Sequence, residues 1–290
     1  MHPFRYIAPT TTMEAVATLA ELGERGRGLA GGTDLLVQLR VGRYDVDAVV
    51  DLKRIPALNL LEIDKVLRIG AAVPCYRVYE DEAIQAAFPG IVDAASLIGG
   101  IQIQSRSTLG GNLCNAAPSA DGVCPLIVHY GMAMITGPSG DREVPVEEFC
   151  TGPGRNALGH GEILVAIDVP VPAAGFGAAY ERFIPRNEMD IAIAGVASSI
   201  SLDAEGETIT DARIALASVG PTPILALSAA ERLIGQKPTP EVFSGAGEAA
   251  ASDASPINDM RGTIEQRREL VRVLTRRTLS KALGRARGSR

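Results

Sequence analysis

Two pairs of adjacent glycines, each close to polar side chains, constrain this chain more than any other feature of its sequence. The first pair, Gly31-Gly32, is followed by Thr33 and Asp34 at a point where a short strand is expected to lead into a helix. Glycine permits positive φ and lets a ligand approach the backbone without meeting a Cβ. Consecutive N–H groups in such a turn form a concave anion site, to which the helix start adds positive potential. Taken alone, this segment also fits an ordinary tight turn.

The second pair, Gly110-Gly111, lies between Thr108 and Asn112. The Thr108 hydroxyl and the glycine amides can donate to phosphate oxygens, and the Asn112 side chain can donate and accept. Alone, this segment also fits a glycine-rich surface loop. Two such loops in one chain, with Asp121 soon after the second, indicate a site for a diphosphate. The G-x-G-x-x-G and G-x-x-x-x-G-K-[ST] patterns are missing, which disfavours a Rossmann site and a P-loop.

Length and composition indicate a soluble globular protein with two or three substructures. The chain has 290 residues, of which 46% are hydrophobic and 21% charged. No window approaches the roughly twenty uninterrupted apolar residues of a transmembrane helix. The first residues, Met1 to Tyr6, lack signal-peptide anatomy, so we expect a cytoplasmic protein.

The cysteines and histidines suggest no metal site on this chain. None of the four cysteines forms a C-x-x-C pair, and their spacings match neither zinc nor iron–sulfur patterns. We expect reduced thiols, with any iron–sulfur centre on another chain. The histidines, His2, His129 and His160, lie in no metal-ligand or Ser/His/Asp pattern. We expect no catalytic proton-transfer residue and no metal ligand.

Charge is distributed unevenly along the chain. The net charge is −6, but residues 261–290 carry +8 and the remainder −14. The acidic body disfavours nucleic acid as a partner. The basic tail alternates with apolar residues and is typical of an amphipathic helix. A solvated helix face, docking on an acidic partner and a membrane surface all remain open for it, and nothing specifically indicates the membrane.

Hydrophobic periodicity and turn residues predict an α+β protein with mixed sheets. We expect helices at 12–23, 35–41, 76–87, 91–98, 121–129, 228–235, 240–250 and 264–283, the fifth of them capped by Asp121. We expect strands at 28–30, 46–52, 66–72, 162–169, 179–184, 191–202 and 212–219 and a hairpin at 132–144. Residues 101–118 are expected to be irregular. A Pro/Ala/Gly-rich stretch at 170–177 predicts a domain boundary, and the polar turn at 182–192 fits a solvated connection.

Three segments together make a resemblance specific: AGGTDL, IQIQSRSTLGGNLCNAAPSAD and RNEMDIAIAGVA. In this order they resemble the FAD-binding medium subunit of molybdenum hydroxylases. That family includes the medium subunit of aerobic carbon monoxide dehydrogenase and the flavin domain of xanthine dehydrogenase. The resemblance covers nearly the whole chain. It implies an FAD-binding fold of the vanillyl-alcohol oxidase type, with subdomains 1–56 and 57–173 and a C-terminal flavoprotein domain, 174–290.

The resemblance also implies where FAD is bound. One loop would wrap the pyrophosphate with Leu29, Ala30, Gly31, Gly32, Thr33, Asp34, Leu35 and Leu36. The other side would be contacted by Thr108, Gly110, Gly111 and Asn112. Asp121 matches an acidic residue that bonds cofactor hydroxyls, and Leu164 matches a backbone contact near the isoalloxazine. Arg182 lies where the family often has lysine, near the flavin's polar edge. Ile98 replaces an aromatic residue of some members, and Asp190-Ile191 would lie near the flavin and the approaching acceptor.

The function implied by the resemblance is electron transfer in a heterotrimer. A small subunit would hold [2Fe–2S] clusters, a large subunit the molybdenum cofactor, and the complex would be a dimer of heterotrimers. FAD on this chain would pass electrons to an external acceptor, with a nicotinamide, a quinone, a ferredoxin and oxygen all open. Two other classes compete: a stand-alone FAD-dependent oxidase or reductase of the same fold, and a flavin-free structural subunit. The intact glycine motifs argue against the second.

Overall fold

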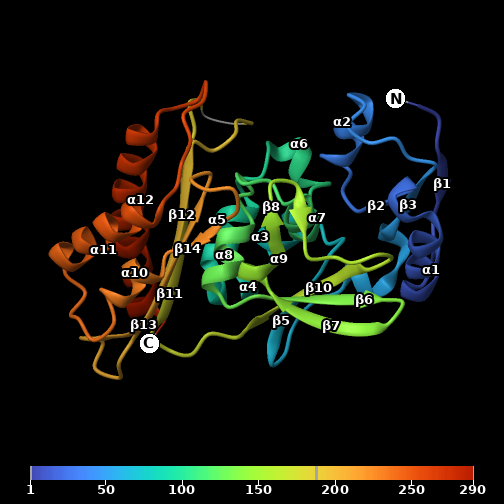
Figure 1. Ribbon diagram of the computed structural model, residues 1–290. Coiled ribbons are helices and arrows are strands. Elements are labelled where there is room, and N and C mark those ends of the chain that lie inside the picture. The colour runs from blue at the N-terminus through green and yellow to red at the C-terminus, as the bar shows by residue number, and fades with distance from the viewer. Residues whose placement is uncertain (1, 187–188, 290) are drawn as a thin grey trace.

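The computed structural model describes residues 2–186 and 189–289 (Figure 1). Its first unit is a small parallel sheet in the order β1-β3-β2, formed by Arg5–Ile7, Ala48–Asp51 and Gly26–Leu29. Helix α1 (Thr12–Leu22) connects β1 to β2, and α2 (Leu35–Arg40) follows the first glycine pair. A helix was predicted from residue 12, and in the structure a capping box of Thr11 and Glu14 starts α1 there.

The second unit contains a five-stranded sheet in the order β4-β5-β10-β6-β7. Its strands are Leu61–Ile63, Val66–Gly70, Ile163–Pro170, Met132–Gly137 and Gly140–Pro145, and all neighbouring pairs are antiparallel. The last two strands are the predicted hairpin with its glycine-rich turn. A two-stranded ribbon, β8 (Cys150–Gly152) with β9 (Arg155–Asn156), lies beside this sheet.

Short helices connect the strands of the second unit. They are α3 (Cys75–Glu80), α4 (Glu82–Ala87), α5 (Pro89–Ala95), α6 (Ile101–Gln104), α7 (Leu109–Asn115), α8 (Val123–Val128) and α9 (Val146–Phe149). The prediction of an irregular stretch at 101–118 was wrong, because α6 and α7 both lie within it. The predicted cap at Asp121 was also wrong, since Gly122 precedes α8 without a side-chain cap and Asp121 is engaged elsewhere.

The third unit is an antiparallel sheet in the order β11-β12-β13-β14, with helices on one face (Figure 1). Its strands are Phe176–Phe183, Ala194–Leu202, Ile209–Ala217 and Ile224–Leu225, and its helices are α10 (Leu227–Glu231), α11 (Pro240–Asp253) and α12 (Ile264–Gly288). Side chains alternate between the two faces of a strand. Tyr180 and Ala197 therefore join the core of the second unit, whereas Val196 and Ile214 pack under α11 and α12.

The basic helix α12 is packed along the third unit by its apolar side. Val271, Leu274 and Leu279 are buried in the core that the helix shares with the sheet. Lys281 and Arg285 pair with Asp93 of α5, so part of the positive charge joins the third unit to the second. Within the described ranges, no helix combines the length and the hydrophobicity needed to cross a bilayer.

His129 lies where the third unit packs against the second. It is 2% exposed, and its ring lies between those of Phe88 and Phe176, with centroid distances of 6.2 and 5.3 Å. Nδ1 lies 2.8 Å from the Pro125 carbonyl oxygen, whereas Nε2 has no partner among the described residues. Burial, together with a smaller contribution from the nearby Arg285 guanidinium, lowers the pKa of His129 to about 4. The native protein therefore holds this imidazole neutral.

We expect His129 to make the protein less stable in mild acid. The unfolded chain takes up a proton near pH 6.5 and the folded chain only near pH 4, so the stability present above pH 6.5 is lost as the pH falls toward 4. This difference between the pKa values of the unfolded and folded chain corresponds to about 3 kcal/mol of folding stability. Urea unfolding at several pH values should show that His129→Leu loses less stability than the wild type over this window. His2→Leu, at an exposed site, is the control, and equal slopes for all three proteins would contradict the prediction.

Candidate functional site

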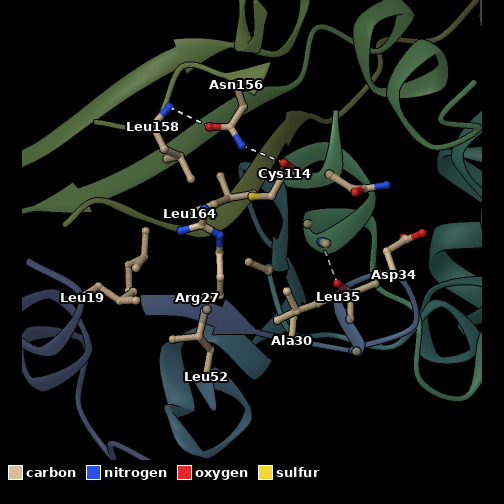
Figure 2. Close-up of a pocket in the computed structure, with 18 of the residues that line it drawn as sticks. Leu19, Arg27, Ala30, Asp34, Leu35, Leu52, Cys114, Asn156, Leu158 and Leu164 are labelled. Carbon is tan, nitrogen blue, oxygen red and sulfur yellow. Dashed lines mark hydrogen bonds between the residues drawn. The ribbon is translucent and has the colours of Figure 1, made fainter. Parts of the chain in front are cut away.

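A cavity of about 680 Å³ lies between the first and second units (Figure 2). It brings together twelve of the residues predicted for the cofactor: Ala30, Gly31, Gly32, Thr33, Asp34, Leu35, Ile98, Thr108, Gly110, Gly111, Asn112 and Leu164. Six predicted residues do not line it: Leu29, Leu36, Asp121, Arg182, Asp190 and Ile191. Two glycine-containing segments far apart in the sequence therefore form one site.

Backbone geometry explains why both residues of the first pair are glycines. Gly32 has φ +79°, in the region that L side chains rarely adopt. A Cβ on Gly31 would lie 1.9 Å from the carbonyl oxygen of Arg106, on the segment that leads to the second pair. Gly31 is thus required because the two loops cross in contact, and not only because a ligand approaches it.

Replacing Gly31 by alanine is expected to destabilise the protein. The added methyl would overlap backbone that no side-chain rotation can move, so one of the two loops must shift. Overpacking of this kind costs about 1–3 kcal/mol. Urea unfolding of Gly31→Ala measures the loss, with Gly245→Ala as control, since a Cβ there meets nothing within 4 Å. An unchanged unfolding midpoint for Gly31→Ala would show that the loops do not cross as described.

The second glycine pair begins helix α7. Thr108 is the N-cap, and its Oγ1 accepts a hydrogen bond of 2.8 Å from the Gly111 amide, which leaves the hydroxyl hydrogen free to donate. A Cβ on Gly110 would lie 2.6 Å from backbone atoms of Ala71, so Gly110 packs inward. A Cβ on Gly111 would meet only Thr108 Oγ1, at 2.9 Å. Because Gly111 lines the cavity, its missing side chain leaves space there for a ligand.

Side-chain amides fix the walls of the cavity. Asn112 Oδ1 accepts from the Gly122 amide at 3.0 Å, which leaves its NH₂ group to donate. Gln38 of α2 donates to Asn115 of α7 at 2.9 Å. Asn156 donates to the Cys114 carbonyl at 2.7 Å and accepts from the Leu158 amide at 3.0 Å, as Figure 2 shows. These bonds join α2, α7 and the β8–β9 ribbon around one space.

Arg27 is a cavity residue that the sequence analysis missed. It projects from β2 into the cavity (Figure 2), and its guanidinium lies 4.6 Å from the ring centroid of Tyr44. It donates to the carbonyls of Glu24 and Gly26 at 3.0 and 2.9 Å. No carboxylate in the described part of the chain lies at ion-pair distance from it. The only available signal was a basic residue in the strand that enters the glycine turn.

Apolar side chains provide the rest of the lining. Leu19, Leu52 and Leu158 line the cavity, and Figure 2 shows Leu164 close to Cys114. Burial raises the pKa of the Cys114 thiol to about 12, so the thiol stays protonated at neutral pH and is a poor nucleophile. Covalent attachment of a cofactor through this cysteine is therefore disfavoured. His160 also lines the cavity, and it is exposed.

Asp121 and Arg182 lie behind the cavity wall and pair with each other. Their side chains are 10% and 6% exposed, and Asp121 also accepts from the Tyr180 hydroxyl at 2.7 Å. Arg182 donates to the Leu97 carbonyl at 2.9 Å, next to Ile98 of the cavity wall. Burial raises the pKa of Asp121, whereas Arg182 and Tyr180 act in the opposite direction. The ion pair joins β11 of the third unit to two segments of the wall.

Asp190 and Ile191 belong to the loop between β11 and β12. Asp190 accepts from the Ile191 amide at 2.8 Å and pairs with Arg186 at 3.5 Å. The side chain of the preceding Met189 lies 3.3 Å from the Cβ position of Gly100, so the loop reaches the start of α6. Asn187 and Glu188 of the predicted polar turn lie outside the described residues.

The lining suits a nucleotide cofactor with a diphosphate. Backbone amides, the Thr108 hydroxyl, the Asn112 amide and the Arg27 guanidinium all converge on the cavity, and leucines supply apolar contacts for rings. The volume is within the range of about 300–1,000 Å³ that is common for cofactor sites. The space left at Gly111 lies beside these donors. The residues present thus fit a flavin dinucleotide.

Comparison with known proteins identifies this class of site. Residues 2–172 match the family described as the FAD binding domain in molybdopterin dehydrogenase. Residues 178–282 match the CO dehydrogenase flavoprotein C-terminal domain. The chain therefore belongs to the family of FAD-binding medium subunits of molybdenum-hydroxylase-type dehydrogenases, and it is an FAD-binding component of an oxidoreductase.

Individual relatives agree with this placement over their whole length. The chain is 33% identical over 286 residues to the xanthine dehydrogenase FAD-binding subunit of Escherichia coli O157:H7, covering 98% of this chain and 97% of the relative. It is 32% identical over 283 residues to the carbon monoxide dehydrogenase medium chain of Hydrogenophaga pseudoflava, covering 97% and 98%. A solved structure of carbon monoxide dehydrogenase from Hydrogenophaga pseudoflava matches with a TM-score of 0.93 at 33% identity, covering 98% of this chain and 99% of that one. The predicted resemblance, α+β fold and FAD cofactor are confirmed.

Proposed function

We propose that this chain is the FAD-binding electron-transfer subunit of a heterotrimeric molybdenum-containing hydroxylase or dehydrogenase. It receives electrons from [2Fe–2S] clusters of a small subunit and delivers them to an external acceptor, while a large subunit holds the molybdenum cofactor. The complex is a dimer of such heterotrimers. Within the chain, residues 1–56 and 57–173 form the two FAD-binding subdomains, and residues 174–290 form the C-terminal domain.

The observation that carries this proposal is the set of donors around the space at Gly111. Bound FAD supplies the redox chemistry through its isoalloxazine ring, so the chain needs residues that bind and orient it. The loop from Leu29 to Leu36 and the segment from Thr108 to Asn112 are proposed to hold the pyrophosphate from two sides. Arg27 adds positive charge in a chain whose net charge is −6.

The remaining predicted residues are proposed to act at the ring systems or behind them. Ile98 and Leu164 line the cavity and offer apolar contacts. Asp190 and Ile191 lie on the loop that reaches α6, beside the flavin end. Asp121 and Arg182 are engaged with each other, and we propose that they hold the wall segments that carry Ile98 and Asn112.

Gel filtration of the native protein tests the proposed function. The expected result is a yellow chain that elutes together with molybdenum and iron at the size of a multi-subunit complex. A yellow monomer that turns over a substrate by itself would instead indicate a stand-alone oxidase or reductase. A colourless chain with no bound flavin would contradict the assignment of the cavity.

A further inference from the structure

A buried carboxylate lies behind the first glycine loop. Asp51 is the last residue of β3, pairs with Leu29 at the end of β2, and is 4% exposed. Its Oδ1 accepts from the Lys53 ammonium at 2.5 Å and from the Lys53 backbone amide at 3.0 Å. Its Oδ2 accepts from the hydroxyl of Tyr6 on β1. Asp51 therefore fixes both the backbone and the side chain of Lys53.

The hydrogen bonds around Asp51 keep its carboxylate ionised. Burial alone would raise the pKa of this carboxyl, but the bonds from Lys53 and Tyr6 outweigh burial and hold the pKa below its ordinary value. The bond to Asp51 in turn raises the pKa of Tyr6, whose hydroxyl stays protonated and donates. Lys53 is thus held by a full negative charge, which strengthens the hydrogen bond between them.

The same ammonium group reaches the glycine loop. Lys53 Nζ donates to the carbonyl oxygen of Ala30 at 3.1 Å, immediately before Gly31. The backbone of Lys53 is also held from its other side, because the Asn59 side chain donates to the Lys53 carbonyl at 2.9 Å. Lys53 therefore contacts the loop from a fixed position.

The bond from Lys53 to Ala30 sets the direction of the Gly31 amide. A peptide unit is planar and trans, so its C=O group and the N–H group of the next residue point in opposite directions. Ala30 and Gly31 line the cavity (Figure 2), whereas Lys53 is not among the described residues that line it. The Ala30 carbonyl therefore points away from the cavity toward Lys53, and the Gly31 N–H points to the cavity side.

The amides of this loop are available to a ligand. Within residues 2–186 and 189–289, the backbone N–H groups of Gly31, Gly32 and Thr33 donate to no acceptor. Backbone N–H groups are strong donors that need a partner, and consecutive ones in a turn form a concave anion site. The loop thus presents three donors beside the space at Gly111.

We propose that Lys53, held by Asp51, is a positioning residue for FAD: it binds the Ala30 carbonyl and thereby aims the Gly31 amide at the cofactor's pyrophosphate. The inference rests on the proposed function, which places the pyrophosphate at this loop, and it adds a residue that does not itself touch the cofactor. Adjacent glycines leave a loop many conformations, so a bond from outside the loop is needed to keep one of them. A donor that already points at its ligand costs less entropy when the ligand binds.

The test titrates the apoprotein of the whole chain with FAD, follows its urea unfolding, and records the phosphorus NMR signals of bound FAD. Lys53→Met keeps the aliphatic part of the side chain and removes the ammonium, whereas Lys53→Arg keeps a charged donor. Because Lys53→Met leaves Asp51 buried without its cation, Asp51→Asn/Lys53→Met separates that cost from the loss of the Ala30 bond. The control is Lys237→Met, which breaks an exposed ion pair with Glu207 on the third unit.

We expect Lys53→Met and the double variant to bind FAD at least about tenfold more weakly and to shift the phosphorus signals, because the amide bonds to the phosphates change. Lys53→Arg should restore both readouts, and Lys237→Met should match the wild type.

Two results would overturn the positioning role and leave the proposed function intact. One is wild-type FAD affinity in Lys53→Met, or weak binding with unshifted phosphorus signals. The other is a double variant that regains FAD affinity together with its urea midpoint, since Lys53 would then act through stability alone. If Lys53→Met fails to fold, the double variant decides between these outcomes. A wild-type apoprotein that takes up no FAD contradicts the proposed function itself.

Discussion

Replacing Gly111 by leucine should abolish FAD binding while leaving the fold intact. The glycine lines the cavity, and a Cβ there meets only Thr108 Oγ1, so the new side chain extends into the space proposed for the pyrophosphate. Leucine favours a helix more than glycine does, which offsets the small shift that the Thr108 hydroxyl must make away from the new Cβ at 2.9 Å. We expect FAD to bind at least about 100-fold more weakly, or about 2.7 kcal/mol. Flavin absorbance of the purified protein and titration of the apoprotein with FAD measure this.

A matched control comes from another helical glycine. Gly284 of α12 is exposed and has nothing within 4 Å of its Cβ position, so Gly284→Leu adds the same side chain far from the cavity. That variant should retain a full complement of FAD. If Gly111→Leu also retained full FAD, the pyrophosphate would have to lie elsewhere than beside α7. If Gly111→Leu unfolded, the glycine would be needed for packing, as at Gly31.

Local patterns in the sequence were enough to predict much of the fold. The Thr11–Glu14 capping box starts α1 where a helix was expected, and the glycine-rich turn at 137–140 joins β6 and β7 of the expected hairpin. Such signals depend on neighbouring residues only, so they are visible without the rest of the chain. Residues 101–118 were expected to be irregular because glycines, which have low helix propensity, follow Thr108. The structure instead has α6 and α7 in this stretch, and Thr108 is the N-cap of α7. Packing against Ala71 and the loop at Gly31 offsets that propensity.

The two glycine loops of the cavity were predicted from the sequence, whereas the residues of its side walls were not. Glycines and hydroxyls next to one another in the sequence show a phosphate-binding pattern directly. Arg27, Asn156 and His160 reach the cavity only because separate strands and turns meet there. The same holds for Asp121, whose partners Tyr180 and Arg182 come from a distant strand. The neighbouring residues alone predict that Asp121 caps a helix. In the structure its carboxylate pairs with the buried Arg182 guanidinium, which attracts it more strongly than the backbone amides at the start of α8 do.

Several of the glycines have structural roles rather than direct ligand-binding roles. Gly31 is required by the Arg106 carbonyl and Gly110 by the Ala71 backbone, while Gly111 alone among these three leaves space in the cavity. The motif therefore combines two requirements: the loops must cross closely, and the crossing must leave space for a ligand. From the sequence alone, all three glycines are predicted to contact the ligand, because either requirement excludes a Cβ. Two variants distinguish these requirements: Gly31→Ala should change the stability of the protein, whereas Gly111→Leu should change its FAD content.

Breaking the buried Asp121–Arg182 pair should give the largest loss of stability among the substitutions considered. Arg182→Met leaves the Asp121 carboxylate buried without its cation and frees the Leu97 carbonyl. Removing one partner of a buried ion pair typically costs about 3–5 kcal/mol. Urea unfolding of the apoprotein measures the loss. Arg25→Met is the control, because Arg25 pairs with Asp45 and Asp47 at sites about half exposed, where ion pairs contribute about 1 kcal/mol or less.

The double variant Arg182→Met/Asp121→Asn shows whether charge burial is the cause. Removing both charges leaves no uncompensated carboxylate, so the double variant should be more stable than the sum of the single losses predicts. Its FAD affinity should nevertheless stay below that of the wild type, because the bonds that hold the Ile98 segment to β11 are still missing. A loss below about 1 kcal/mol for Arg182→Met would mean that water reaches the pair. In that case β11 could not hold the cavity wall through these two side chains.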